Sequence, residues 1–298
     1  MYADPFITKS IRPSIMNNII TIGLGLIGGS FNLDLKKIFP DASFGGIDKN
    51  KAHVQEALKL KLIDFEGQDK DIKDADLIVI ATPVDHINSL LTNCLDLINE
   101  DCLIIDMGSI KSKICTTIAS HPKRRNFLAC HPIAGTEFSG PSAAHQGLFE
   151  QKTMIVCEVE KTAFKLQEQA LSIFKKMNLR LRYMDPVAHD KHIAYVSHLS
   201  HISSFMLGKT VLEKEKDERD IFDLAGSGFE STVRLAKSAP SMWTPIFREN
   251  KENILETLEE YIQNLKQFKT LIESDNFNAV FNEIEYTNQL KEILNGLA

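Results

Sequence analysis

The sequence feature that most constrains the fold is a short apolar run that leads directly into a glycine-rich turn. Residues 19–30 read IITIGLGLIGGS, which is a strand pattern followed by G-x-G-x-x-G and then by the helical stretch 31–38. The three glycines have separate roles, since Gly23 allows a tight turn, Gly25 lets a pyrophosphate approach the backbone, and Gly28 allows helix and strand to pack closely. This order of strand, turn and helix indicates a dinucleotide-binding unit.

The residues around this turn indicate which dinucleotide it binds. Backbone N–H groups at Leu26 and Ile27, where the helix starts, would bind the phosphates, because free N–H groups and the helix dipole favour an anion. A second apolar run ends at Asp48, about 20 residues after the glycines, where a carboxylate can accept hydrogen bonds from a ribose diol. The same carboxylate repels a 2′-phosphate, and Lys49 and Asn50 provide one cation but no arginine. We therefore expect NAD in preference to NADP.

The chain changes character near residue 185. Before it, β-branched or apolar runs alternate with amphipathic stretches, which is typical of βα units on a parallel sheet. The expected strands are Ile19–Leu24, Phe44–Ile47, Leu77–Ala81, Leu103–Asp106, Phe127–Cys130, Met154–Val156 and Leu181–Tyr183. After Pro186 apolar residues recur at helical spacing. We expect a Rossmann-type α/β domain over residues 1–184 and an all-helical domain over 185–298, with two long helices from Trp243 through Ile293.

Composition excludes several classes of protein. The 298 residues are 43% hydrophobic and 25% charged with a net charge of −6, and the basic residues are scattered, so no nucleic-acid-binding stripe is present. The five cysteines include no C-x-x-C pair, which favours reduced thiols and a cytoplasmic protein. Residues 1–17 contain no apolar signal-peptide core, and no stretch approaches the ~18–20 apolar residues of a membrane span.

A second motif points to the reaction. Residues 129–140 read ACHPIAGTEFSG and are expected to follow a strand at the carboxyl edge of the sheet. This segment resembles H-P-[IM]-x-G-x-E-x-S-G of the prephenate and arogenate dehydrogenases. Further similarity lies in the D-x-x-S-x-K turn at 106–111, in ATPV at 81–84, in SHLSH at 197–201, and in segments between 234 and 253. The sequence is identified as a member of this family over about residues 18 to 265.

The resemblance implies NAD-dependent oxidation and decarboxylation of prephenate to 4-hydroxyphenylpyruvate in tyrosine biosynthesis. His131 would take the proton of the substrate hydroxyl, since an imidazole titrates near neutral pH. Ser109 would hydrogen-bond that hydroxyl or His131, although a serine here also suits a helix N-cap. Thr82 and Pro83 are expected beside the cofactor.

The resemblance also supplies candidate substrate contacts. Arg234 would bind one substrate carboxylate in bidentate fashion, and His198 and His201 would contact the substrate side chain. Glu137 would shape the pocket entrance or pair with a cation, and Trp243 would line the pocket, unless it belongs to the core.

Other interpretations remain open. Histidines 189, 192, 198 and 201 suggest a metal site, but no H-E-x-x-H or cysteine partner accompanies them, and we expect no metal. The motifs do not separate prephenate from arogenate as substrate. A β-hydroxyacid dehydrogenase would lack H-P-I-x-G-T-E, and a cofactor-binding sensor would lack the base or the arginine.

The sequence departs from the family in two places. Glu230 and Ser231 stand where the family carries a basic residue and an aspartate before the arginine, which puts the usual ionic latch in doubt. Ser200 replaces a proline, so the helix is expected to be straighter there. The resemblance and the many apolar residues after position 200 predict a homodimer joined through the helical domain.

Overall fold

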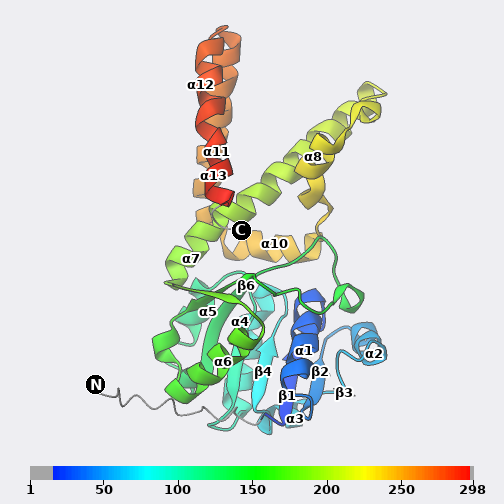
Figure 1. The fold of residues 1–298 in the computed structure, drawn as a ribbon, viewed down its shortest axis with the longest axis vertical. Coiled ribbons are helices and arrows are strands. Elements are labelled where there is room, and N and C mark those ends of the chain that lie inside the picture. The colour runs from blue at the N-terminus through cyan, green and yellow to red at the C-terminus, as the bar shows by residue number, and fades with distance from the viewer. Residues whose placement is uncertain (1–15, 296–298) are drawn as a thin grey trace, which may run out of the picture.

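The computed structural model describes residues 16–295, which form a sheet-based part and a set of helices that project from it (Figure 1). The expectation that the first 17 residues carry no signal peptide falls almost entirely outside the described residues. Between residues 16 and 295, no helix combines the length and apolar character needed to cross a bilayer.

One sheet of eight strands forms the centre of the first part. The strands are β1 (Asn18–Ile22), β2 (Ser43–Ile47), β3 (Phe65–Glu66), β4 (Leu77–Ile80), β5 (Leu103–Asp106), β6 (Phe127–Ile133), β7 (Thr153–Cys157) and β8 (Arg180–Met184). Their order is β3-β2-β1-β4-β5-β6-β7-β8, and every neighbouring pair is parallel except β6 with β7. The order 3-2-1-4-5-6 of the first six strands is that of dinucleotide-binding sheets, which confirms the predicted fold class.

The sheet differs from the sequence prediction in three details. All seven predicted strands are present, but the two-residue β3 was missed. β7 is antiparallel to β6, whereas a parallel sheet was expected. β6 also continues to Ile133 instead of ending at Cys130, because β7 supplies partners as far as the pair Ile133 and Thr153. His131 therefore lies within a strand and not after it.

Helices cover both faces of the sheet. Helix α1 (Leu26–Ile38) and α6 (Phe164–Lys176) pack on one face, and α3 (Asp69–Lys73), α4 (Val84–Leu97) and α5 (Ser112–Thr117) on the other. Successive strand residues alternate between these two cores, so the strands are apolar on both sides. The remaining helices here are α2 (Lys51–Lys59) and three short 3₁₀ turns, η1 (Arg124–Asn126), η2 (Pro141–Ala143) and η3 (Val159–Lys161).

The second part is entirely helical. It comprises α7 (Pro186–Ile193), a π-helical turn η4 (Ala194–His198), α8 (Leu199–Asp217), η5 (Phe222–Leu224), α9 (Ser227–Val233), η6 (Arg234–Lys237), α10 (Pro240–Glu249), α11 (Lys251–Glu273), α12 (Phe277–Asn288) and α13 (Leu290–Asn295). The prediction of two long helices after Trp243 was wrong, because breaks at Asn250, at residues 274–276 and at Gln289 divide this segment into four. Asp275, in the second break, has a left-handed φ of 52° that no helix accommodates.

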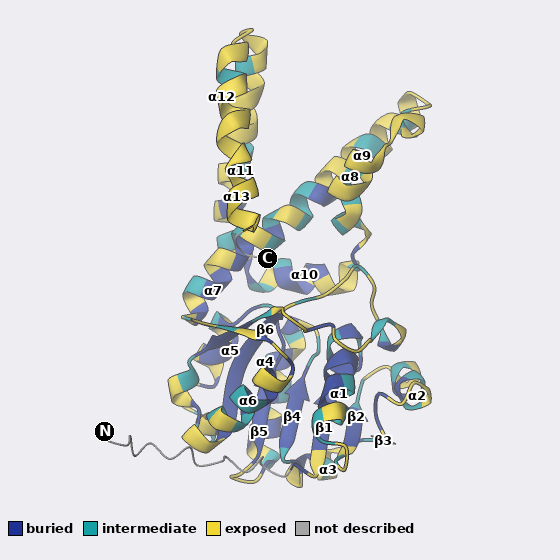
Figure 2. Ribbon diagram, viewed as in Figure 1, coloured by how far each residue is buried: buried dark blue, intermediate teal, exposed yellow. Residues whose placement is uncertain are grey.

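The helical part contacts the sheet domain mainly through α7 and α10, which lie against α5 and α4. Trp243 and Ile246 of α10 join the core beside α4. Helix α8 and the hairpin of α11 and α12 extend away from the sheet, and their surfaces are largely exposed (Figures 1 and 2). The cofactor residues predicted from the sequence lie in the sheet part, and most of the predicted substrate residues lie in the helical part.

Candidate active site

The glycine turn between β1 and α1 has the shape that a dinucleotide requires. Gly23 has a φ of +96°, and a Cβ there would lie 2.5 Å from the carbonyl oxygen of Ala81. A Cβ at Gly28 would collide with the carbonyl oxygen of Gly23, whereas one at Gly25 would enter open space. Helix α1 has no acidic residue in its first turn and no side-chain cap, which leaves the N–H groups near Leu26 and Ile27 for an anion.

Asp48 and Thr82 complete this cofactor cradle. Asp48 accepts hydrogen bonds from the backbone N–H groups of Leu24 at 3.0 Å and Asn50 at 2.8 Å, one on each oxygen, and both oxygens can accept another. The Thr82 hydroxyl is buried without a partner among the described residues, and its backbone nitrogen lies against Gly23. Pro83 follows as the residue that caps α4. These residues fit a bound NAD, which would supply the hydride acceptor.

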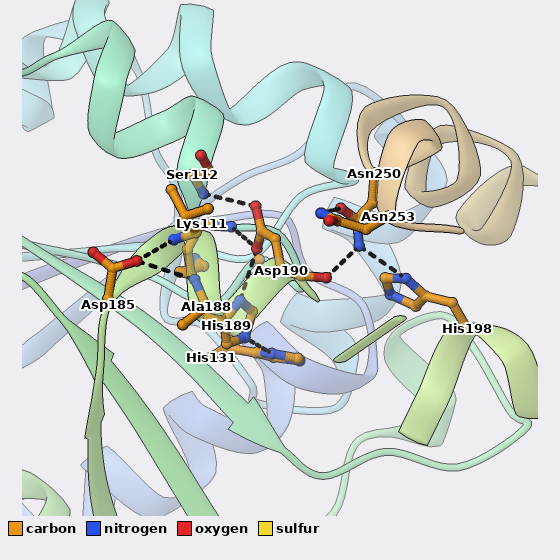
Figure 3. Close-up of polar contacts among 12 residues, drawn as sticks. Lys111, Ser112, His131, Asp185, Ala188, His189, Asp190, His198, Asn250 and Asn253 are labelled. Atoms are coloured by element: carbon orange, nitrogen blue, oxygen red, sulfur yellow. Dashed lines mark hydrogen bonds and ion pairs between the residues drawn. The ribbon is translucent and has the colours of Figure 1, made fainter. Parts of the chain in front are cut away.

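Among residues 16–295, His131 has a partner on one ring nitrogen and none on the other. Its Nδ1 lies 2.9 Å from Nε2 of His189, whose Nδ1 lies 2.7 Å from Oδ1 of Asp190 (Figure 3). A carboxylate only accepts, so His189 donates from Nδ1, and the tautomer with one proton accepts on Nε2. His131 must then donate from Nδ1, which leaves a lone pair on Nε2. Burial, with smaller contributions from His189, Lys111 and His198, lowers the pKa of His131 well below its ordinary value.

The turn from β5 to α5 is anchored by a buried ion pair directly behind β6. Lys111 and Asp106 pair with both side chains fully buried. Lys111 Nζ also donates to the carbonyl oxygen of Cys130 at 2.7 Å, and Asp106 accepts from the Cys130 N–H at 3.0 Å. The first and last residues of the D-x-x-S-x-K motif therefore fix the turn to the strand that carries His131.

Ser109 lies half-buried in this turn, and the structure corrects one expectation about it. Helix α5 begins at Ser112 with Lys111 at its N-cap, so Ser109 is not the capping residue. His189, and not Ser109, occupies Nδ1 of His131. A contact between Ser109 and the substrate hydroxyl stays a prediction.

Asp190 joins the helical part to the start of α5. Its Oδ1 accepts from the Lys111 N–H at 2.7 Å and its Oδ2 from the Ser112 N–H at 2.8 Å (Figure 3). The carboxylate thus caps a helix that has no cap of its own, and it does so from 78 or 79 residues further along the chain. No sequence pattern indicated this contact.

An aromatic group lines the helical side of the site. The ring of His201 stacks on Trp243 with 3.5 Å between centroids, and His198 meets Trp243 edge-on at 5.9 Å. The Asn250 side-chain amide donates to the carbonyl oxygen of Asp190 at 2.7 Å and lies 3.2 Å from Nδ1 of His198. Burial lowers the pKa of His198 to about 4, so His198 is neutral and carries its proton on Nε2. Trp243 is both core and site wall, and its indole N–H is buried without a partner among the described residues.

Arg234 and Glu137 face each other on the solvent-exposed side of the site. Arg234, in η6, lies 3.6 Å from the Glu137 carboxylate, and its side chain is 54% exposed. After burial, the positive charge of Arg234 contributes to the lowered pKa of His201, which places the two side chains in one electrostatic neighbourhood. Glu230 and Ser231 are exposed, and the cation that Glu137 meets is Arg234.

The structure thus brings most of the predicted residues into two groups. One is the cofactor cradle of the glycine turn, Asp48 and Thr82, and the other is the reactive edge, where β6 carries His131. Sequence reasoning had considered His189 only as a rejected metal ligand and Asn250 only as part of a matching segment, and it gave neither these two nor Asp190 a role in the reaction. Ser200 lies in α8, close behind the π-helical turn η4, a kind of irregularity that is frequent at functional sites. Among residues 16–295, no group of three or more histidine, cysteine or acidic side chains could hold a metal ion.

Comparison with known proteins gives consistent matches to both parts. The model of the prephenate dehydrogenase nucleotide-binding domain matches residues 31–183, and that of the prephenate dehydrogenase dimerization domain matches residues 185–286. The prephenate dehydrogenase of Bacillus subtilis is 32% identical over 285 residues, covering 94% of this chain and 76% of the relative. The cyclohexadienyl dehydrogenase of Zymomonas mobilis is 29% identical over 264 residues, covering 88% and 90%.

A solved structure agrees with these sequence matches. Prephenate dehydrogenase from A. aeolicus, in complex with hydroxyphenyl propionate and NAD+, superposes with a TM-score of 0.84 and 30% identity over 97% of this chain and 100% of that chain. The two family models follow each other along most of the chain in the order that the sequence motifs predicted. The chain therefore belongs to the prephenate dehydrogenase family.

Proposed function

We propose that this protein catalyses the NAD-dependent oxidative decarboxylation of prephenate to 4-hydroxyphenylpyruvate in tyrosine biosynthesis. The observation that carries the proposal is His131, which lies at the carboxyl edge of the sheet with its Nε2 lone pair available and Nδ1 held by His189. The family match confirms the predicted enzyme class, the NAD cofactor and the homodimer.

The reaction demands little covalent chemistry from the protein. NAD held at the glycine turn would supply the hydride acceptor for C4 of the cyclohexadienol ring. His131 takes the hydroxyl proton on Nε2, and Ser109 in the neighbouring turn donates a hydrogen bond that orients that hydroxyl. The ring carboxylate leaves as CO₂ and the ring becomes aromatic, which drives the step forward.

Substrate binding is assigned to the open side of the site. Arg234 binds a substrate carboxylate, for which it exchanges its contact with Glu137. His198 and His201 contact the substrate side chain, and Trp243 forms the wall on which His201 stacks. Neutral His198 suits the side-chain keto group of prephenate, because its Nε2–H can donate to a carbonyl oxygen, whereas His201 donates its Nδ1–H to the carbonyl oxygen of Ser197.

Two broader assignments follow the same reasoning. We place the division between the cofactor-binding and the helical domain near residue 185, between the end of β8 at Met184 and the start of α7 at Pro186. We also assign the protein to the cytoplasm, because its five cysteines are all free and buried, as suits a reducing compartment.

The decisive assay uses the purified protein with prephenate and NAD, and follows NADH and CO₂ together. Equal yields of both products support the proposal, and absence of turnover overturns it. Parallel assays with arogenate decide the substrate, because arogenate carries an amine in place of the keto group. A higher kcat/KM with arogenate would replace prephenate by that alternative.

Cofactor choice is tested with Asp48→Ser. The wild-type protein should prefer NAD over NADP, and the variant should narrow that preference, since it loses the diol contact and no longer repels a 2′-phosphate. The ratio of kcat/KM for the two cofactors measures this effect. Equal efficiencies in the unmutated protein would contradict the role of Asp48.

A further inference from the structure

A chain of three side chains runs from the reactive edge of β6 into α7 (Figure 3). The rings of His131 and His189 meet edge to face at 78°, and a nitrogen of one ring lies within hydrogen-bond distance of a nitrogen of the other. His189 is 2% exposed and Asp190 is 3% exposed, so bulk water does not compete for their contacts. The proposed proton transfer names only His131, which leaves the two buried residues without an assigned role in the reaction.

The groups around His131 do not stabilise a positive charge on its ring. Its described partner is another imidazole, and a positive charge on His189, Lys111 or His198 opposes a proton there. No carboxylate contacts its ring among the described residues. The next ring, that of His189, contacts the Asp190 carboxylate at 2.7 Å. A positive charge on His189 therefore has a direct counter-ion.

We propose that Asp190 and His189 form, with His131, a proton relay in which the charge created by the reaction comes to lie on His189. This inference rests on the proposed function for the source of the proton. The substrate O–H bond breaks as an N–H bond forms at Nε2 of His131. The Nδ1–H bond of His131 then breaks as an N–H bond forms at Nε2 of His189, so one proton enters the relay and one positive charge ends beside Asp190.

The surroundings of Asp190 stabilise a negative charge on its carboxylate. The backbone N–H groups of Lys111 and Ser112 each donate to it, one to each oxygen. Hydrogen bonds from backbone donors to a carboxylate are charge-assisted and favour the anion. His189 and Asp190 are thus positioning residues that act through His131: they fix its tautomer and stabilise its protonated state.

The other ionisable groups around the relay do not supply an alternative counter-ion. Lys111 and Asp106 pair with each other. The thiols of Cys130 and Cys157 have pKa values raised by burial. His198 is held by Asn250, and Asp185 caps α7 through the N–H groups of Val187 and Ala188.

The test compares two substitutions that preserve shape. Asp190→Asn keeps an acceptor for the α5 backbone but removes the charge, so the protonated relay is destabilised. The pKa that governs the acid limb of kcat/KM for prephenate should then fall by about one unit or more, as expected on loss of an adjacent opposite charge. The plateau of kcat should fall at least about 10²-fold, because a weaker base remains.

His189→Gln distinguishes a residue that only positions His131 from one that also takes up its proton. A glutamine oxygen can accept from Nδ1 of His131 and so preserve its tautomer, but a glutamine cannot take up the proton. We expect the same shift of the acid limb as for Asp190→Asn and a comparable loss of kcat. If His189→Gln retains the wild-type rate, or if the acid limb stays in place in both variants, the relay is overturned.

Lys113→Gln is the matched control, because Lys113 follows Ser112 and its exposed side chain pairs with Glu249. It should leave the pH profile unchanged. If Asp190→Asn fails to fold, His189→Gln carries the test, since it leaves the contacts of Asp190 with α5 intact.

A measurement without turnover separates the relay from the proposed function. In ¹⁵N-histidine NMR spectra of the protein with NAD, assigned with His131→Asn and His189→Gln, the ring nitrogens of His131 and His189 should respond together to a single proton. That titration should move to lower pH in Asp190→Asn. Independent titration of the two rings would overturn the relay, whereas lack of activity with prephenate would overturn only the assigned substrate.

Discussion

Among single residues, His131 is the side chain whose nitrogen is assigned to the reacting hydroxyl. His131→Asn should lower kcat by about 10²–10⁴, the usual contribution of a general base. NAD binding should change little, because the cofactor cradle is built from the glycine turn and Asp48. Steady-state kinetics and titration of NADH fluorescence measure the two effects, and a variant that lost cofactor affinity instead would refute the assignment.

Arg234 should give the opposite kinetic pattern. Its side chain is exposed at the open side of the site, and a carboxylate contact there is made equally in the ground state and in the transition state. Arg234→Gln should therefore raise KM for prephenate with little change in kcat. Arg248→Gln, on the exposed face of α10, is the control and should alter neither constant.

At this scale the sequence predicted the residues that carry a local signature. The glycine turn and the segment around His131 are contiguous patterns, each with a physical reason for every essential position. The contacts of the histidines are not local. His131 contacts His189, 58 residues away, and His198 contacts Asn250, 52 residues away. Such contacts depend on how α7, η4 and α10 dock, and no sequence periodicity encodes that docking.

Among the structural elements, the turn from β5 to α5 depends most on buried charge. Lys111→Met leaves the Asp106 carboxylate buried and unpaired, and should lower the free energy of unfolding by about 3–5 kcal/mol. Urea unfolding measures this change. Adding Asp106→Asn should recover much of the loss, because the unpaired charge is then gone.

An exposed ion pair provides the comparison for this prediction. Lys165 and Asp101 lie 2.7 Å apart with side chains 68% and 81% exposed, so Lys165→Met should change the free energy of unfolding by less than about 1 kcal/mol. Equal effects of the two lysine substitutions would contradict the importance of burial.

The sequence predicted elements well where a pattern was long, and poorly where tertiary pairing decided their ends. The apolar runs located seven strands, whereas the two residues of β3 are too few to form a pattern. The extension of β6 through His131 depends on β7, which no local signal could reveal. Apolar residues at helical spacing predicted two long helices after Trp243, but this spacing did not locate the breaks at Asn250, at residues 274–276 and at Gln289.

For the molecule as a whole, the exposed surface of the helical part requires a partner. Large apolar side chains of α8 and α11–α13 are between 37% and 64% exposed; they include Met206, Leu207, Leu212, Leu255, Leu265, Phe268, Ile272, Phe277, Phe281, Ile284, Leu290, Ile293 and Leu294. These helices point away from the sheet domain, so packing against that domain does not cover them (Figures 1 and 2). The match to a dimerization domain identifies the cover as a second copy of the chain.

We expect the dimer interface to bury more than ~2,000 Å² of mostly apolar surface, as obligate interfaces do. Light scattering at low micromolar concentration should give twice the 33.5 kDa mass of one chain. Phe281→Asp, on the exposed face of α12, should shift the mass toward that of one chain, whereas Lys152→Asp on the sheet domain should not. Full activity at the mass of a single chain would contradict an obligate dimer.

The contact of Asp190 with the start of α5 has a consequence for how such proteins can be recombined. The carboxylate belongs to the helical half, while the N–H groups of Lys111 and Ser112 belong to the sheet half. A chimaera made by joining at residue 185 would therefore inherit a helix cap from one parent and the capped helix from the other. An active hybrid would therefore require that the aspartate of one parent reach the backbone N–H groups at the start of α5 in the other. This contact limits which halves can be combined.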